Sequence, residues 1–117
     1  MSKLELKTFV NSVQPLSDLA KQKLPLKCAY RLRKIIEAVN NELDFFAQER
    51  AKILEEAGDW NTATITQKNE INGKIEKLLA FEVEFFEEPL VLPMDIDVNM
   101  SASDLELVKD FIQIKDT

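Results

Sequence analysis

Residues 25–57 dominate the sequence and read PLKCAYRLRKIIEAVNNELDFFAQERAKILEEA. Apolar side chains recur in this stretch at alternating steps of three and four residues, which is the spacing of one face of an α-helix. That seam consists of Ala29, Leu32, Ile36, Leu43, Phe46, Ile53 and Ala57, with Val39 between them. Pro25 suits a first helical turn, and Gly58 is a natural stop. We therefore expect one helix of about 45–50 Å whose seam needs a partner helix.

The chain has 117 residues, enough for one domain with a modest core, and we treat residues 1–117 as a single domain. A hydrophobic content of 45% and a charged content of 31% are values of globular proteins, so disorder of the whole chain is not expected. No run approaches the roughly 20 apolar residues that cross a bilayer, and the first residues lack a signal-peptide core. The expected location is cytoplasmic, with no membrane partner.

The net charge of −6 is unevenly divided along the chain. Residues 1–57 contain 10 Lys and Arg against 8 Asp and Glu, whereas residues 58–117 contain 5 against 13. Direct nucleic-acid binding is therefore not expected, since it depends mainly on neutralising phosphates. The division favours either pairing between the two halves or an acidic surface that binds a basic protein.

The segment 1–24 is predicted to form short amphipathic helices. Its apolar residues have helical spacing, and Pro15 is expected to separate two helices because a proline removes a hydrogen bond from a helix interior. Residues 3–7 alternate strictly between polar and apolar, so the sequence leaves open whether this segment is strand or helix.

Residues 25–81 are predicted to form a long antiparallel helical hairpin. Gly58-Asp59-Trp60-Asn61 has the composition of a tight reversal, and Thr64 with Gln67 has the spacing of a capping box. A second apolar stripe follows, formed by Ile71, Ile75, Leu78 and Leu79 and running to about Phe81. The two stripes are expected to pack on each other.

After about residue 81 the apolar residues no longer recur at helical spacing but at every second position. Residues 81–85 and 90–98 alternate between apolar and polar, which predicts a small β ribbon of two or three strands within residues 82–100. Pro93 confines its strand to an edge or a bulge. Ser103 and Glu106 have capping-box spacing, so a C-terminal helix over residues 103–114 is expected to cover the ribbon. The predicted fold class is mainly α, in an α+β arrangement.

The sequence contains little that supports catalysis. It has no histidine, which removes the commonest general base and metal ligand, and its single cysteine, Cys28, has no partner for a disulfide. Asp95 and Asp97 would share one strand face, as would Glu82 and Glu84, but acidic residues on a solvated strand face are ordinary and nothing completes a metal cage. We expect no enzyme activity, no cofactor and no metal site.

The candidate functional residues are therefore candidates for protein binding. Residues 21–34 carry six basic residues and no acidic one, which indicates either a solvated face or a docking patch for an acidic partner or the chain's own acidic half. Arg50 interrupts the apolar seam, and Trp60 at the reversal is either a packing plug or a binding anchor. The full set is Arg31, Arg33, Lys34, Arg50, Trp60, Glu82, Glu84, Glu87, Glu88, Asp95 and Asp97.

The run from Leu24 to Leu32, of the form LPxKxAYxL, opens a long helix that contains Glu42-Leu43 and Glu49-Arg50. Together with the Glu82-Val83-Glu84 strand, the Pro89-Leu90 turn and the helix expected from Ser103, it resembles small uncharacterised phage and prophage proteins of Gram-positive bacteria. The resemblance implies a viral origin, a helical hairpin and a small β element, in the host cytoplasm or in a virion. The segment 60–67 and Phe85-Phe86 depart from that pattern.

These observations favour a non-enzymatic phage or prophage protein that binds other proteins. The first hypothesis is a structural or assembly accessory that self-associates as a homo-oligomer through the helical seam. The alternative is a small acidic inhibitor of a host defence nucleoprotein, similar in action to anti-CRISPR proteins, with residues 82–97 directed at a basic groove. Direct nucleic-acid binding through residues 21–34 is the weakest reading.

Overall fold

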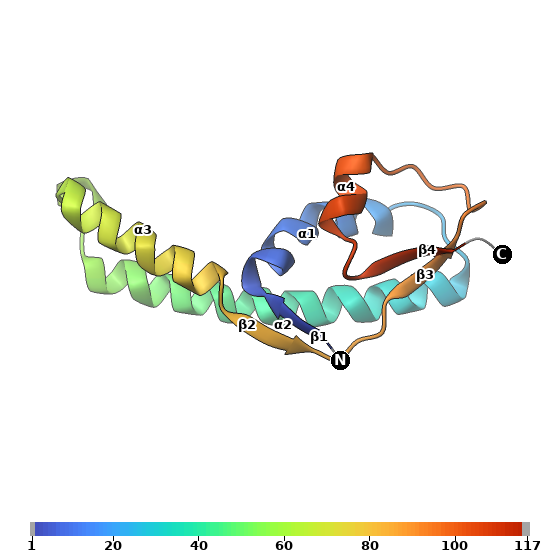
Figure 1. Ribbon diagram of the computed structural model, residues 1–117, viewed down its shortest axis with the longest axis horizontal. Helices are drawn as coiled ribbons and strands as arrows, with labels where there is room; N and C mark the ends of the chain where they lie inside the picture. Colours follow the sequence, from blue (N-terminus) through green and yellow to red (C-terminus); the bar gives the residue numbers. More distant parts are fainter. Residues whose placement is uncertain (1, 116–117) are drawn as a thin grey trace.

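The computed structural model describes residues 2–115, and these form a mainly helical protein with small strand elements (Figure 1). The mainly α class with a minor β part is thus confirmed. The helices are α1 (Leu6–Ala20), α2 (Leu26–Ala57), α3 (Ile65–Leu79) and α4 (Ala102–Leu107), with a 3₁₀ turn, η1 (Trp60–Thr62). The strands are β1 (Ser2–Glu5), β2 (Glu82–Phe85), β3 (Leu90–Pro93) and β4 (Ile112–Lys115).

The predicted long helix is present as α2, which runs along most of the 56 Å length of the molecule. Pro25 has extended backbone angles and immediately precedes the helix, so its missing N–H removes no intrahelical bond. Gly58 ends the helix with φ of 76°, a conformation that side chains with a Cβ rarely adopt. Both boundaries agree with the sequence prediction.

Different elements cover the two halves of α2. Helix α1 and strand β3 pack against its first half, and α3 lies beside its second half after the η1 turn (Figure 1). The capping box predicted for α3 is confirmed: the Thr64 hydroxyl accepts from the Gln67 backbone N–H, and the Gln67 side chain accepts from the Thr64 N–H. We call residues 43–79 the arm.

The core lies where α1, the strands and the segment after α4 meet the first half of α2. Three phenylalanine rings are at its centre: the Phe9 centroid is 5.6 Å from that of Phe85 and 5.7 Å from that of Phe111, and Phe85 and Phe111 are 5.2 Å apart. From α2 the core receives Leu32, Ile35 and Val39. Ile35 is fully buried although the predicted seam did not include it.

The prediction of two short N-terminal helices separated by Pro15 is wrong. Helix α1 is continuous from Leu6 to Ala20, and Pro15 is a buried residue within it. Apolar side chains on both sides of the proline (Leu6, Phe9, Leu16 and Leu19) are all buried, so packing outweighs the cost of a lost hydrogen bond. Of the two readings left open for residues 3–7, the strand holds for Lys3 to Glu5, and the helix begins at Leu6.

The predicted ribbon between residues 82–85 and 90–98 is also wrong. Strand β2 pairs antiparallel with β1, which places Leu4 opposite Val83, and β3 pairs in parallel with β4, which places Leu90 opposite Ile112. The strands thus form two separate two-stranded sheets. This pairing buries Leu4, Phe85, Leu90 and Ile112 together in one core, which a hairpin between adjacent strands would not achieve.

The expected C-terminal helix over residues 103–114 ends much earlier than predicted. Helix α4 stops at Leu107, Val108 and Phe111 enter the core, and the β-branched Ile112 and Ile114 belong to β4. Pairing with β3 therefore overrides the helical spacing of this segment. The residue that caps α4 is Ser101, whose hydroxyl accepts from the Asp104 N–H at 3.1 Å, and not Ser103.

Two serine substitutions test this cap. Ser101→Ala is expected to lower the free energy of unfolding by about 1 kcal/mol, because the Asp104 N–H at the start of α4 loses its acceptor. Ser103→Ala is the matched control and is expected to change it by less than about 0.5 kcal/mol. Urea denaturation of both variants measures the difference, and an equal effect of the two changes would contradict the assignment.

Candidate protein-binding surface

One ion pair joins a predicted binding residue of the basic first half of the chain to one of the acidic second half. The Arg31 guanidinium on α2 donates to the Glu87 carboxylate at 3.2 Å, and each side chain is about one-third exposed (35% and 33%). Glu87 belongs to the loop between β2 and β3. Arg31 therefore binds the chain's own acidic half, which is one of the outcomes that the charge division had left open.

Arg33 and Lys34 remain on the surface of α2. The Arg33 guanidinium forms an ion pair with Glu37 one turn further on, at 3.2 Å, with both side chains about 60% exposed (62% and 59%). The Arg33 and Lys34 cations also lie 5.4 and 5.6 Å from the centre of the Tyr30 ring. Exposed pairs of this kind contribute little to stability, so Arg33 can exchange its partner at small cost.

The acidic candidate residues do not lie together on one face of a strand. Glu82 and Glu84 are exposed on β2, opposite Glu5 and Lys3, and Glu88 is exposed in the next loop. The prediction that Asp95 and Asp97 share a strand face is wrong, because β3 ends at Pro93 and both residues lie in the irregular segment that follows. A turn closed by the bond from the Ile96 N–H to the Pro93 carbonyl ends the alternation.

Arg50 and Trp60 are brought together on the arm. They line a hollow of about 320 Å³ with Leu54 from α2 and with Asn72 and Ile75 from α3. Trp60 is 41% exposed, and the Lys68 ammonium lies 5.3 Å from the centre of its ring system. A half-exposed tryptophan beside a hollow is typical of a binding anchor rather than of a buried plug.

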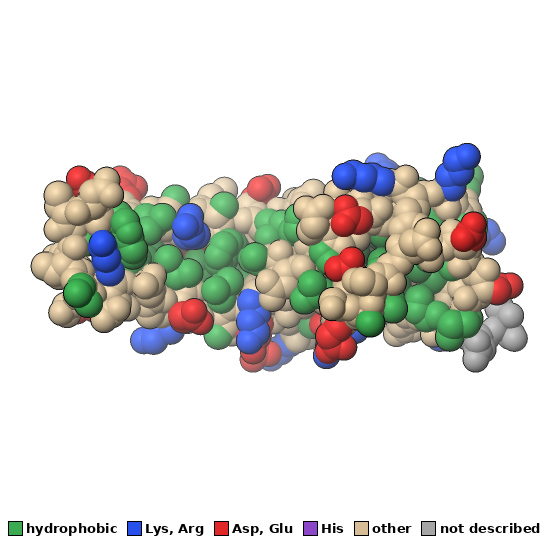
Figure 2. Space-filling model, turned by 90° about the horizontal axis from the view of Figure 1, so that it is seen from above, with side chains coloured by type: hydrophobic (Ala, Val, Ile, Leu, Met, Phe, Trp, Pro, Cys, Tyr) green, Lys and Arg blue, Asp and Glu red, His purple; other side chains and the backbone are tan. Residues whose placement is uncertain are grey.

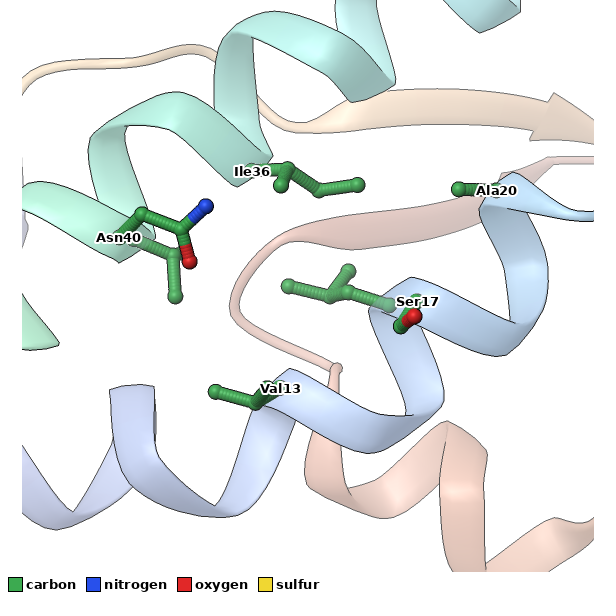
Figure 3. Close-up of a pocket in the computed structure, with 7 residues that line it drawn as sticks. Val13, Ser17, Ala20, Ile36 and Asn40 are labelled. Atoms are coloured by element: carbon green, nitrogen blue, oxygen red, sulfur yellow. The ribbon is translucent and has the colours of Figure 1, made fainter.

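A second hollow lies between α1 and the first half of α2 (Figure 3). Its volume is about 300 Å³, and Figure 3 shows Val13, Ser17 and Ala20 of α1 opposite Ile36 and Asn40 of α2. A further hollow of about 270 Å³ shares Ala20 and Ile36 with it and continues toward the start of α2. The groove between the two helices is therefore lined mainly by apolar side chains and is open to solvent.

The groove and the arm hollow lie along the same face of α2. Ile36 and Leu54 are 18 residues apart, which is five turns of an α-helix, so their side chains leave the helix in the same direction. We define the outer face of α2 as the row that contains these two residues. It consists of Ala29, Arg33, Ile36, Asn40, Leu43, Ala47, Arg50 and Leu54, and no member of the row is buried.

The two sides of the arm differ in polarity. The hollow on the side away from the outer face is lined by Ile53, Ala57 and Ile71 but also by four polar or charged side chains, namely Glu56, Gln67, Glu70 and Lys74. Figure 2 shows hydrophobic side chains gathered along the arm, with basic side chains among them and further charged groups at its edges. The outer face of α2 is therefore the more apolar side and the better candidate for a protein partner.

The remaining features of the described residues add no second site. Residues 2–115 contain no cluster of three or more His, Cys, Asp or Glu side chains that could hold a metal ion, and no helix among them could cross a membrane. The hydrogen bond that the Lys109 ammonium donates to the Glu106 carboxylate raises the pKa of Lys109, but both side chains are largely exposed at the end of α4. Comparison with protein-family models, with curated proteins and with solved structures finds no match.

Sequence reasoning identified Arg50 and Trp60 but missed the α1 wall of the groove. The sequence pattern predicts helices within residues 1–24, but it does not relate Val13 and Ala20 to α2. The sequence does contain a signal for this groove: the residues of the outer face recur at steps of three and four along α2, beside the buried row of Leu32, Ile35 and Val39. A second, partly apolar row on a helix indicates a second packing surface.

Proposed function

We propose that this protein acts by binding other proteins, without a catalytic step, and that its first partner is a second copy of itself. In this proposal α2 and α3 act as an antiparallel helical hairpin, and the outer face of α2 is the contact surface. The setting that the sequence resemblance implies is a phage or prophage, where the protein would serve as a structural or assembly accessory in the host cytoplasm or in the virion.

The observation that carries the proposal is the unburied outer face of α2, with a hollow at each end. It extends from Ala29 to Leu54, about 37 Å at 1.5 Å per residue. With the walls supplied by α1 and α3, a strip of this length and about 20 Å wide has on the order of 800 Å², the contribution of one partner to a standard interface. The chain's own elements cover this strip only in part: Ile36, Leu43 and Leu54 are half-buried, and the other members of the row are exposed.

The inhibitor hypothesis receives no comparable support. Glu87, one of the residues that it needs, forms an ion pair with Arg31, and Asp95 and Asp97 lie in the irregular segment after β3 and not on a strand face. An acidic surface directed at a basic groove requires carboxylates that are gathered on one face. The proposal therefore keeps self-association as the function and does not assign the acidic segment a partner of its own.

Analytical ultracentrifugation of the wild type and of a Leu54→Glu variant tests the proposal. We expect the wild type to form a dimer at high micromolar concentration. Leu54→Glu is expected to raise the Kd of the dimer by more than about 100-fold, because the interface would then contain two unpaired carboxylates, one from each copy. Far-UV circular dichroism should stay unchanged, since Leu54 is only partly buried in the monomer.

Phe86→Glu is the matched control. Phe86 is a large apolar residue, 68% exposed, in the loop between β2 and β3 and away from the outer face. The control should dimerise like the wild type. A wild type that sediments as a monomer at high micromolar concentration, or a Phe86→Glu variant that dissociates as Leu54→Glu does, would contradict the proposal.

A further inference from the structure

Arg50 is an isolated cation in an apolar part of α2. The side chains three and four residues away from it, which are its neighbours on the helix surface, are all apolar: Phe46, Ala47, Ile53 and Leu54. None of the ion pairs formed within residues 2–115 involves Arg50. The ion pairs of the fold therefore do not account for a charge at this position, and local exceptions of this kind are expected at functional sites.

The arm hollow beside Arg50 combines apolar walls with hydrogen-bond donors. Leu54 and Ile75 supply the aliphatic part of its lining, and Trp60 supplies an aromatic ring system that is 41% exposed. The polar groups in the lining are the Arg50 guanidinium, the Trp60 indole N–H and the Asn72 amide, and the first two can only donate. Among the described residues, no Asp or Glu lines this hollow.

The charge around the arm hollow is positive. Besides Arg50, the Lys68 ammonium lies 5.3 Å from the centre of the Trp60 ring system. Asp59 precedes Trp60 in the chain, but its carboxylate accepts from the Asn61 backbone N–H at 2.9 Å and does not line the hollow. The hollow on the other side of the arm contains two glutamates as well as a lysine. An anion is therefore favoured in the arm hollow and not in the other one.

The size of the arm hollow suits a single amino-acid residue. Its volume of about 320 Å³ is at the lower end of the range for small-molecule pockets, which is about 300–1,000 Å³. The last residue of a polypeptide combines an α-carboxylate with a side chain, so an apolar C-terminal residue presents an anion and an apolar group together. An internal Asp or Glu lacks the apolar side chain, and a nucleic-acid phosphate carries no aliphatic group.

We propose that the arm hollow binds the C-terminal residue of a partner polypeptide. Its apolar side chain packs against Leu54, Trp60 and Ile75, and its α-carboxylate accepts from the Arg50 guanidinium, whose paired donors match the two oxygens. Capture of a terminal carboxylate is a recurring mode of peptide recognition. The inference goes beyond self-association and does not depend on it, because one chain supplies the whole lining. Leu54 also belongs to the outer face, so a bound chain end and a second copy should compete.

Trp60 makes binding directly measurable, because it is the only tryptophan of the 117-residue chain. Its fluorescence is followed while acetyl-Gly-Gly-Leu with a free C-terminal carboxylate is added, at a protein concentration below the Kd of the dimer. We expect a saturable change in emission. The same tripeptide with a C-terminal amide is the matched control, and its Kd should be higher by about tenfold or more, because it offers Arg50 no charged acceptor.

Arg50→Met separates the carboxylate contact from the apolar contact. This change keeps a long side chain on the helix and removes the guanidinium, so the Kd of the carboxylate peptide should rise to that of the amide peptide. The Kd of the amide peptide should stay unchanged. Arg33→Met is the matched control, since Arg33 is another exposed arginine of α2 that does not line the arm hollow. It should bind both peptides as the wild type does.

Three results would overturn the inference. The first is an equal Kd for the carboxylate and amide peptides, and the second is the absence of a saturable change up to about 10 mM peptide. The third is binding of free 4-methylpentanoate with the Kd of the tripeptide, which would assign the hollow to small carboxylic acids instead of chain ends. All three leave the proposed self-association standing, and a wild type that is monomeric in ultracentrifugation would leave this inference standing.

Discussion

Replacing Phe111 with alanine will lower the free energy of unfolding by about 3–5 kcal/mol. Phe111 is completely buried, and its ring centroid lies 5.7 Å from that of Phe9 and 5.2 Å from that of Phe85. Truncation removes a large apolar side chain and leaves a cavity between the segment after α4, α1 and β2. Small domains are stable by only about 5–15 kcal/mol, so this loss is a large share of the total free energy of unfolding. Urea denaturation followed by circular dichroism measures the loss.

Phe86→Ala is the control for this prediction. Phe86 follows the buried Phe85 directly, yet it is 68% exposed, so its truncation should change the free energy of unfolding by less than about 0.5 kcal/mol. A Phe111→Ala variant with a wild-type denaturation curve would show that the C-terminal segment does not enter the core. It would then also remove the basis for β4 as a strand.

Local pattern was sufficient to predict the helical part of the fold. The boundaries of α2 depend on Pro25 and Gly58, and the start of α3 depends on the Thr64 capping box, so each is determined by residues a few positions apart. Helical hydrogen bonds are themselves local, and the sequence pattern reports them directly. Pro15 is the exception, because the packing of α1 on α2 and the strands decides whether the helix continues through it.

The strand pairing could not be obtained in the same way. Alternation identifies a segment with one buried face, but it does not name the segment that supplies its hydrogen bonds. Here both partners come from the ends of the described chain: β1 pairs with β2, and β4 pairs with β3. The C-terminal segment had the spacing of a helix and became a strand because Leu90 and Leu92 offered it a buried partner.

The candidate surface was predictable only in part. Arg50 and Trp60 are conspicuous because a charge interrupts an apolar row and a tryptophan occupies a turn. The groove between α1 and α2 depends on how two helices pack, so the residues from α1 could not be assigned to it from sequence. The predicted seam mixed the two rows of α2: it contained Ile36, which lines the groove, and omitted Ile35, which is buried in the core.

Substitution of the adjacent isoleucines of α2, Ile35 and Ile36, should therefore change the free energy of unfolding by very different amounts. Ile35→Ala is expected to lower the free energy of unfolding by about 2–5 kcal/mol, because Ile35 is fully buried against the core. Ile36→Ala removes the same atoms from a partly exposed position, so the expected loss in the monomer is less than about 1 kcal/mol. Urea denaturation measures both losses, at a protein concentration below the Kd of the dimer so that the monomer is compared.

The same pair separates folding from self-association. Ile36→Glu should fold normally but sediment as a monomer, because the carboxylate would be buried in the apolar contact surface on the outer face of α2. Ile35→Ala should retain the wild-type Kd wherever it is folded, since its side chain faces the interior. If Ile36→Glu dimerised as tightly as the wild type, the outer face would not be the contact surface. If Ile36→Ala destabilised the monomer as much as Ile35→Ala does, both residues would belong to one buried row and α2 would have no free face.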